Sequence, residues 1–132
     1  MDKIEHIGIA VNSLKVSSEV YQKILGVKSY KQEEVRPEGV IAEFFKVGEG
    51  KIELLEPTNS ESPIAKFLAK KGEGIHHIAF AVNNIYDEMR RLKSEGFILL
   101  SDIPKQGADN KLVCFVHPKD TSGVLIEICQ EI

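Results

Sequence analysis

Two histidines and two glutamates stand at matching places in two similar stretches of the chain. His6–Leu14 (HIGIAVNSL) and His77–Ile85 (HIAFAVNNI) share five of nine residues at a shift of 71 positions. Each half also carries a later glutamate inside an apolar run, Glu53 in KIELL and Glu127 in VLIEIC. Two imidazoles and two carboxylates suit a divalent cation such as Co, Ni, Zn or Mn, with coordination positions left for substrate or water. The repeat therefore predicts a metal site.

Each of these residues alone has a plain structural explanation. A single strand histidine is usually a hydrogen-bonding residue, and a single strand glutamate usually faces water. A carboxylate inside an apolar strand is costly unless it is paired, exposed or bound to a cation. The recurrence of His6, Glu53, His77 and Glu127 in both halves favours the metal site.

Strand side chains alternate between two faces, so position assigns each residue to a face. His6 shares its face with Gly8 and Ala10, and His77 shares its face with two alanines at positions 79 and 81. The bulkier residues between them are expected to pack beneath helices. The small residues beside the histidines therefore predict room for a ligand.

One further acid, Glu43, interrupts the apolar run VIAEFF and has no counterpart in the repeat. This position makes Glu43 a candidate for an additional acid–base task. The alternative is an edge-strand glutamate that faces water.

The elements around these residues repeat as well. Each half reads as a strand, an amphipathic helix and about three further strands. The first helix is expected to begin after a cap at Asn12 or Ser13 and to end at Gly26. The second is expected to begin after a cap at Asn83 or Asn84 and to end at Gly96. The later strands are expected around 27–33, 41–47 and 51–55, and around 97–101, 112–117 and 124–129.

These elements predict one α+β domain over 1–132, built from two tandem βαβββ modules. Module one spans about 1–60 and module two about 73–132, joined by a helix over about 62–72. Similar halves of this kind are expected to pair about a pseudo-twofold axis.

Composition limits the function classes. The 132 residues carry 17 Lys+Arg against 20 Asp+Glu, without a basic cluster that would favour nucleic acid. No apolar run approaches a membrane span of about 20 residues, and the start of the chain does not read as a signal peptide. Cys114 and Cys129 form no CxxC pair and are expected to be reduced core residues. These features predict a cytoplasmic protein.

Several segments together resemble the methylmalonyl-CoA epimerase family of the vicinal oxygen chelate superfamily, nearly end to end. The segments are His6–Val11, Glu43 in its strand, Glu53–Pro57, Ile75–Ala79, Ile103–Gly107, Phe115–Lys119 and Gly123–Glu127. The His-x-Gly strand alone indicates only the superfamily, whereas the later segments are specific to the epimerases.

The resemblance implies a curled mixed sheet that forms a cup around a divalent metal, with cobalt as the first choice. It implies His6, Glu53, His77 and Glu127 as ligands, and it selects His77 over the adjacent His76. Glu53 lies where some family members carry Gln, so that ligand is anionic here.

The implied reaction exchanges (2R)- and (2S)-methylmalonyl-CoA by removing the C2 proton and returning it to the opposite face. Glu43 and Glu127 match the pair of acid–base carboxylates, although one base with substrate rotation would also suffice. An acyl-CoA substrate and a homodimer are implied as partners. Lys105, His117 and Lys119 could meet CoA phosphates, but they equally suit solvated loops, so no substrate-contacting residue is assigned.

Three other functions share the fold. A glyoxalase I (a lactoylglutathione lyase) would carry the same His/Glu/His/Glu set, and Glu43 with the His-Pro-Lys segment favours the epimerase instead. A non-catalytic small-molecule-binding protein normally lacks the full set of four ligands. A dioxygenase needs only two His and one Glu around iron, so Glu53 counts against it.

Overall fold

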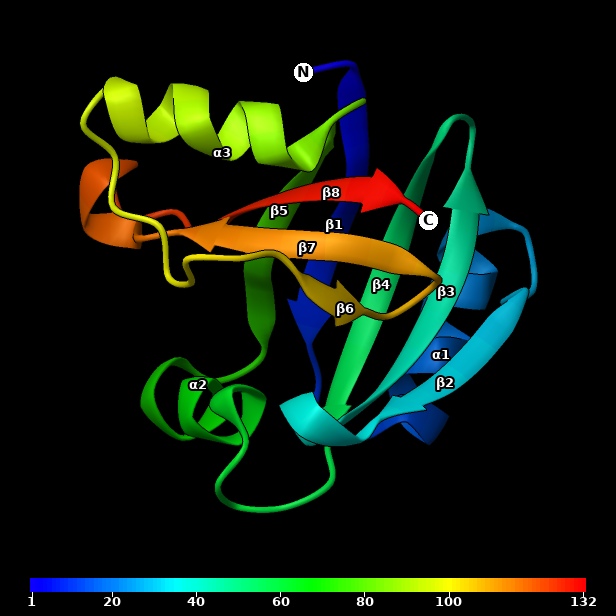
Figure 1. Cartoon of the computed structure of the whole chain (residues 1–132). Helices are drawn as coiled ribbons and strands as arrows, with labels where there is room; N and C mark the ends of the chain where they lie inside the picture. The colour runs from blue at the N-terminus through cyan, green and yellow to red at the C-terminus, as the bar shows by residue number, and fades with distance from the viewer. The chain divides into compact units, whose positions relative to one another are not determined.

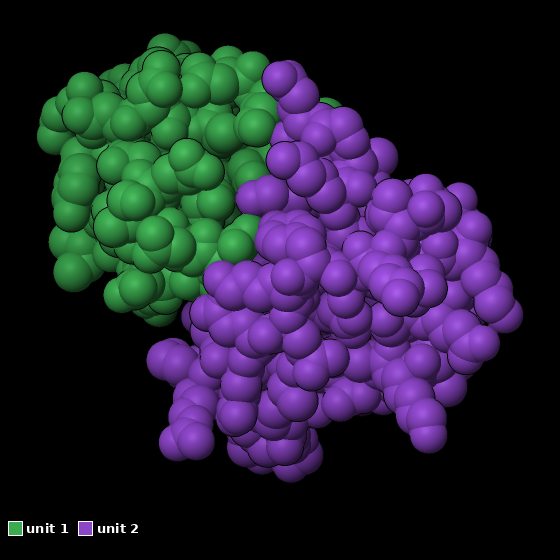
Figure 2. Space-filling model, turned by 90° about the vertical axis from the view of Figure 1, so that its right-hand side faces the viewer, with its two compact units in different colours: residues 1–5, 77–132 green, residues 6–76 purple.

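The computed structural model describes all residues from Met1 to Ile132. Eight strands and three α-helices follow one another in the order predicted by the repeat, β-α-β-β-β twice with a helix between (Figure 1). The chain divides into two compact units (Figure 2). We call residues 6–76 the N-terminal unit, and residues 1–5 with 77–132 the C-terminal unit.

The N-terminal unit contains a four-stranded mixed sheet with strand order β2-β3-β4-β1. Strand β1 runs parallel to β4, and the other neighbours are antiparallel. The elements are β1 (Lys3–Ala10, from His6 onward in this unit), α1 (Leu14–Leu25), β2 (Lys31–Val35), β3 (Val40–Val47), β4 (Gly50–Pro57) and α2 (Pro63–Lys71). A short 3₁₀ turn, Arg36–Glu38, joins β2 to β3.

Helix α1 begins and ends where its capping residues predict. The Ser13 hydroxyl accepts a hydrogen bond from the Val16 N–H at 3.3 Å, and Gly26 closes the helix at a φ of 71°. The helix covers one face of the sheet, where Leu14 packs with Phe45 and Leu54.

The predicted apolar stripe of α1 is only partly correct. Tyr21 and Leu25 pack against the core, whereas Val16, Val20 and Ile24 are exposed. The buried stripe begins at Leu14, because Leu14, Tyr21 and Leu25 follow a helical spacing that turns Val16, Val20 and Ile24 away from the sheet.

The C-terminal unit has the strand order β1-β5-β8-β7-β6, with β5 parallel to β8. Here β1 contributes only its first residues, and the Asp2 N–H donates to the Ala81 carbonyl at 2.8 Å. The other elements are β5 (Gly74–Ala81, from His77 onward in this unit), α3 (Ile85–Ser94), β6 (Lys105–Gly107), β7 (Lys111–Val116) and β8 (Ile126–Glu131). A 3₁₀ turn, Pro118–Asp120, follows β7.

The core of the C-terminal unit lies between α3 and the sheet. Ile85, Met89 and Leu92 form the predicted helix stripe, and all three are buried. They pack with Cys114 and Ile128, and both cysteines of the chain are buried thiols, as predicted. No helix combines the length and apolar character needed to cross a membrane.

The predicted strand over 97–101 is wrong. Leu99 forms only a single bridge with Val116, and the edge strand of this unit is β6. Only two backbone hydrogen bonds join this segment to the β7 side, Leu100 N–H to Phe115 O and His117 N–H to Ile98 O. The Ile98 N–H instead donates to the Asp120 carboxylate at 3.1 Å, so a side chain replaces part of the strand ladder.

Gly39 gives one test of this architecture. Its φ of 64° is left-handed, and a Cβ there would lie 2.8 Å from the Ser62 Cβ. We expect Gly39→Ala to destabilise the chain by more than the roughly 1–3 kcal/mol that backbone strain alone costs. Urea unfolding measures this loss. Gly48→Ala is the control, since Gly48 has a similar φ of 58° and open space around it; equal losses would contradict the steric explanation.

Candidate functional site

In the N-terminal unit, His6 and Glu53 lie on the same face of the sheet. Parallel β1 and β4 place Gly8 opposite Glu53, so the even-numbered residues of β1 share the Glu53 face. His6 Nε2 lies 3.5 Å from Glu53 Oε1, and both side chains are buried.

The C-terminal unit repeats this arrangement. Parallel β5 and β8 place Ala79 opposite Glu127, and His77 Nε2 lies 3.3 Å from Glu127 Oε1. Both residues are buried. The Phe115 ring meets the His77 imidazole edge-on, with ring centroids 5.8 Å apart, and helps to fix its orientation.

These pairs have the geometry of neighbouring metal ligands. Two atoms bound to one ion at about 2.1 Å, at angles between square and tetrahedral, lie roughly 3.0–3.4 Å apart. The two nitrogen–oxygen separations, 3.5 and 3.3 Å, are close to this range. Each glutamate stands opposite a small residue, Gly8 or Ala79, which leaves space beside the carboxylate. Each unit therefore carries a buried imidazole–carboxylate group suited to a divalent cation.

The side chain of His76 does not point the same way as that of His77, as predicted. Its ring meets Phe67 of α2 edge-on at a centroid distance of 5.0 Å, whereas the next residue, His77, faces Glu127. The adjacent histidines thus have different surroundings.

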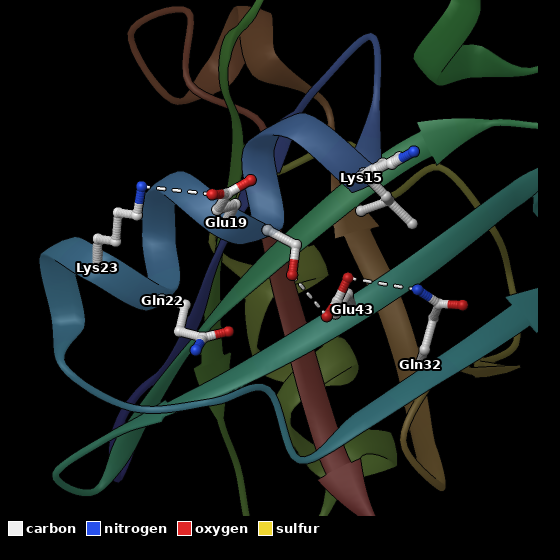
Figure 3. Close-up of a pocket in the computed structure, with 8 residues that line it drawn as sticks. Lys15, Glu19, Gln22, Lys23, Gln32 and Glu43 are labelled. Carbon is white, nitrogen blue, oxygen red and sulfur yellow. Dashed lines mark hydrogen bonds and ion pairs between the residues drawn. The ribbon is translucent and has the colours of Figure 1, made fainter.

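Glu43 is buried, but it does not face the same side of the sheet as His6 and Glu53. Antiparallel β3 and β4 pair Glu43 with Leu54 and Phe44 with Glu53. Leu54 belongs to the core beneath α1, so Glu43 faces the helix. Figure 3 shows its carboxylate between α1 and the strands. Glu43 therefore does not share a face of the sheet with the predicted ligands of its own unit, His6 and Glu53.

Ser18 and Gln32 are the partners of Glu43 that sequence reasoning missed. The Ser18 hydroxyl donates to Glu43 Oε2 at 2.8 Å, and the Gln32 side-chain amide donates to Oε1 at 3.3 Å. The run VIAEFF does not indicate which face of the sheet Glu43 occupies, because the strand shows no alternation of apolar and polar residues. Ala42, Phe44 and Phe45 are all buried.

The three candidate phosphate contacts lie near the ends of strands in the C-terminal unit. Lys105 is the exposed first residue of β6. His117 caps the turn after β7, because its Nδ1 accepts a hydrogen bond from the Lys119 N–H at 3.1 Å. The imidazole of His117 thus has a structural task, and contact of these residues with phosphate stays a prediction.

A sequence profile of the glyoxalase/bleomycin resistance protein/dioxygenase superfamily matches residues 5–115. The chain belongs to this superfamily, as its two βαβββ repeats and paired His–Glu groups indicate.

Within the superfamily, several relatives are named methylmalonyl-CoA epimerases. The chain is 40% identical over 130 residues to the ethylmalonyl-CoA/methylmalonyl-CoA epimerase of Cereibacter sphaeroides, covering 97% of each chain. It is 41% identical over 130 residues to the uncharacterized protein YqjC of Bacillus subtilis, covering 98% of this chain and 93% of YqjC.

A solved structure is similarly close. It is a Streptomyces coelicolor methylmalonyl-CoA epimerase variant in complex with 2-nitronate-propionyl-CoA. The TM-score is 0.96 at 34% identity, covering 99% of this chain and 95% of that one.

Proposed function

We propose that this chain is a metal-dependent epimerase that interconverts (2R)- and (2S)-methylmalonyl-CoA. The observation that carries the proposal is the same buried His–Glu pair in both units, His6–Glu53 and His77–Glu127, in a chain whose relatives are such epimerases. The acyl-CoA complex of the Streptomyces relative supports an acyl-CoA substrate.

We assign His6, Glu53, His77 and Glu127 as ligands of one divalent metal, with cobalt as the first choice and Ni, Zn or Mn as alternatives. The chemistry of the donors supports this assignment, because imidazole with carboxylate suits these ions. When bound, such a metal stabilises the negative charge that develops on the thioester oxygen as C2 loses its proton.

The C2 proton needs a carboxylate base, and Glu127 is our choice. It is buried beside His77, and a carboxylate has two oxygens, so one can face a cation while the other takes the proton. Because Glu43 faces α1, we assign both proton transfers to Glu127, with rotation of the deprotonated substrate between them.

Deuterium exchange tests the reaction. The metal-loaded chain is incubated with (2S)-methylmalonyl-CoA in D₂O, and deuterium at C2 is followed by mass spectrometry in substrate and product. One base serving both faces should label both epimers from the earliest times, above a sample without protein. Label in the early product alone would contradict the single base and indicate a second one.

The same incubation separates the epimerase from its nearest alternative. No C2 exchange with metal supplied, together with turnover of the methylglyoxal–glutathione hemithioacetal, would establish a glyoxalase I-like lyase. Binding of an acyl-CoA without exchange or turnover would indicate the non-catalytic alternative. The homodimer and the cytoplasmic location stay predictions.

Glu43→Gln gives a second test of the assignment. Because the Glu43 carboxylate lies on the helix-facing side with Ser18 and Gln32, we expect its loss to lower the turnover number by less than about tenfold, below the usual contribution of an acid–base group. Steady-state epimerisation at saturating metal measures this effect. A loss of several hundredfold with normal metal content would restore Glu43 as a catalytic base.

A further inference from the structure

The pocket above Glu43 has no task in the proposed reaction. It has a volume of about 510 Å³ and lies between α1 and the strands β2 and β3 (Figure 3). Its lining combines one buried acid with polar side chains of α1 and β2: Lys15, Ser18, Glu19, Gln22, Lys23 and Gln32. This pocket faces the helix side of the sheet, opposite to the face that carries His6 and Glu53.

The Glu43 side chain lines the pocket and is held in place by hydrogen bonds. Only 6% of the residue is exposed, and each of its oxygens accepts a hydrogen bond, from Ser18 and from Gln32. Both donors are neutral, so they orient the carboxylate without cancelling its charge. A buried charge is costly unless an opposite charge compensates it. The site therefore favours a positively charged group.

Lys15 places a positive charge on the wall of the same pocket, where it could meet a negatively charged group of a ligand. It is exposed and forms no ion pair, whereas the other lysine of the pocket, Lys23, pairs with Glu19 at 3.3 Å. A simple amine at Glu43 would be repelled by Lys15. A molecule with both an ammonium and a carboxylate group would satisfy Glu43 and Lys15 together.

We propose that this pocket is a second binding site, for a small zwitterion of the amino-acid class. The ammonium group lies against Glu43, beside the Ser18 and Gln32 side chains, and the carboxylate lies toward Lys15. The proposal is independent of the epimerase reaction, since none of these residues belongs to the His–Glu pairs.

Calorimetric titration of the full chain tests the site with matched probes. Glycine and γ-aminobutyrate are the zwitterions, while butylamine and butyrate each keep one of the two charged groups. We expect saturable binding of at least one zwitterion, at least tenfold tighter than either single-charge probe. Butylamine binding as tightly as the zwitterions, or no binding of either zwitterion, would overturn the proposal.

Variants locate the binding. Glu43→Gln keeps the size and hydrogen-bonding capacity of the side chain but removes its charge, and Lys15→Ala changes an exposed residue; each should weaken zwitterion binding at least tenfold. Glu49→Gln, an equal charge change on an exposed residue of the β3–β4 hairpin, should leave binding unchanged. Binding that is unaltered in both Glu43→Gln and Lys15→Ala would overturn the site, and far-ultraviolet circular dichroism confirms that each variant is folded.

Discussion

Replacing Glu127 with Gln is expected to lower the rate of epimerisation by about 10²–10⁴-fold, the usual contribution of a general acid–base group. The substitution keeps the size of the side chain, but the amide cannot take the C2 proton. It also removes a negative charge beside His77, so metal affinity should fall as well. The rate is therefore measured at saturating metal, with the metal content of each sample determined by mass spectrometry.

Glu131→Gln is the matched control for this substitution. Glu131 lies on the same strand, β8, and its side chain is 84% exposed near Lys111. The control should epimerise methylmalonyl-CoA at the rate of the unchanged chain. If metal-loaded Glu127→Gln stays within tenfold of the unchanged chain, Glu127 is not the base.

Replacing His77 with Ala should lower the affinity for the divalent metal by at least about 100-fold. Loss of a residue that only orients a metal ligand already lowers metal affinity by about 10–100-fold, and loss of a ligand itself should cost more. The imidazole nitrogen 3.3 Å from Glu127 Oε1 is removed, and the buried carboxylate loses its partner. Calorimetric titration with Co²⁺ measures the affinity, and the metal retained after dialysis gives an independent value.

The neighbouring histidine provides a control within the same strand. His76 packs against Phe67 of α2, so His76→Ala should change stability but not cobalt affinity. Equal losses of affinity in the two variants would contradict the assignment of His77 as a ligand.

Much of the fold could be predicted because short-range chemistry decides it. Ser13 and Gly26 set the ends of α1, and the structure shows these caps. The helix expected over about 62–72 is α2, Pro63–Lys71. The His6–Glu53 and His77–Glu127 pairs could be predicted as well, because strand alternation and the repeat assign each of these four residues to a face of its sheet.

The orientation of Glu43 could not be predicted, because β3 is apolar on both faces. Phe44 faces the Glu53 side and Phe45 faces α1, so the sequence pattern carries no alternation from which to place the acid between them. Edge strand β6, Lys-Gln-Gly, was missed for a similar reason: three residues without apolar character give no strand signal.

The division of β1 between the two units has a consequence for handling the protein. Residues 1–5 belong to the C-terminal unit, and the Asp2 N–H donates to Ala81 at the end of β5. A fragment cut at the repeat boundary would leave β5 without this neighbour, and uncovered strand edges promote aggregation. A bulky fusion partner at Met1 would therefore act on the C-terminal unit, the half of the molecule that lies farthest along the chain.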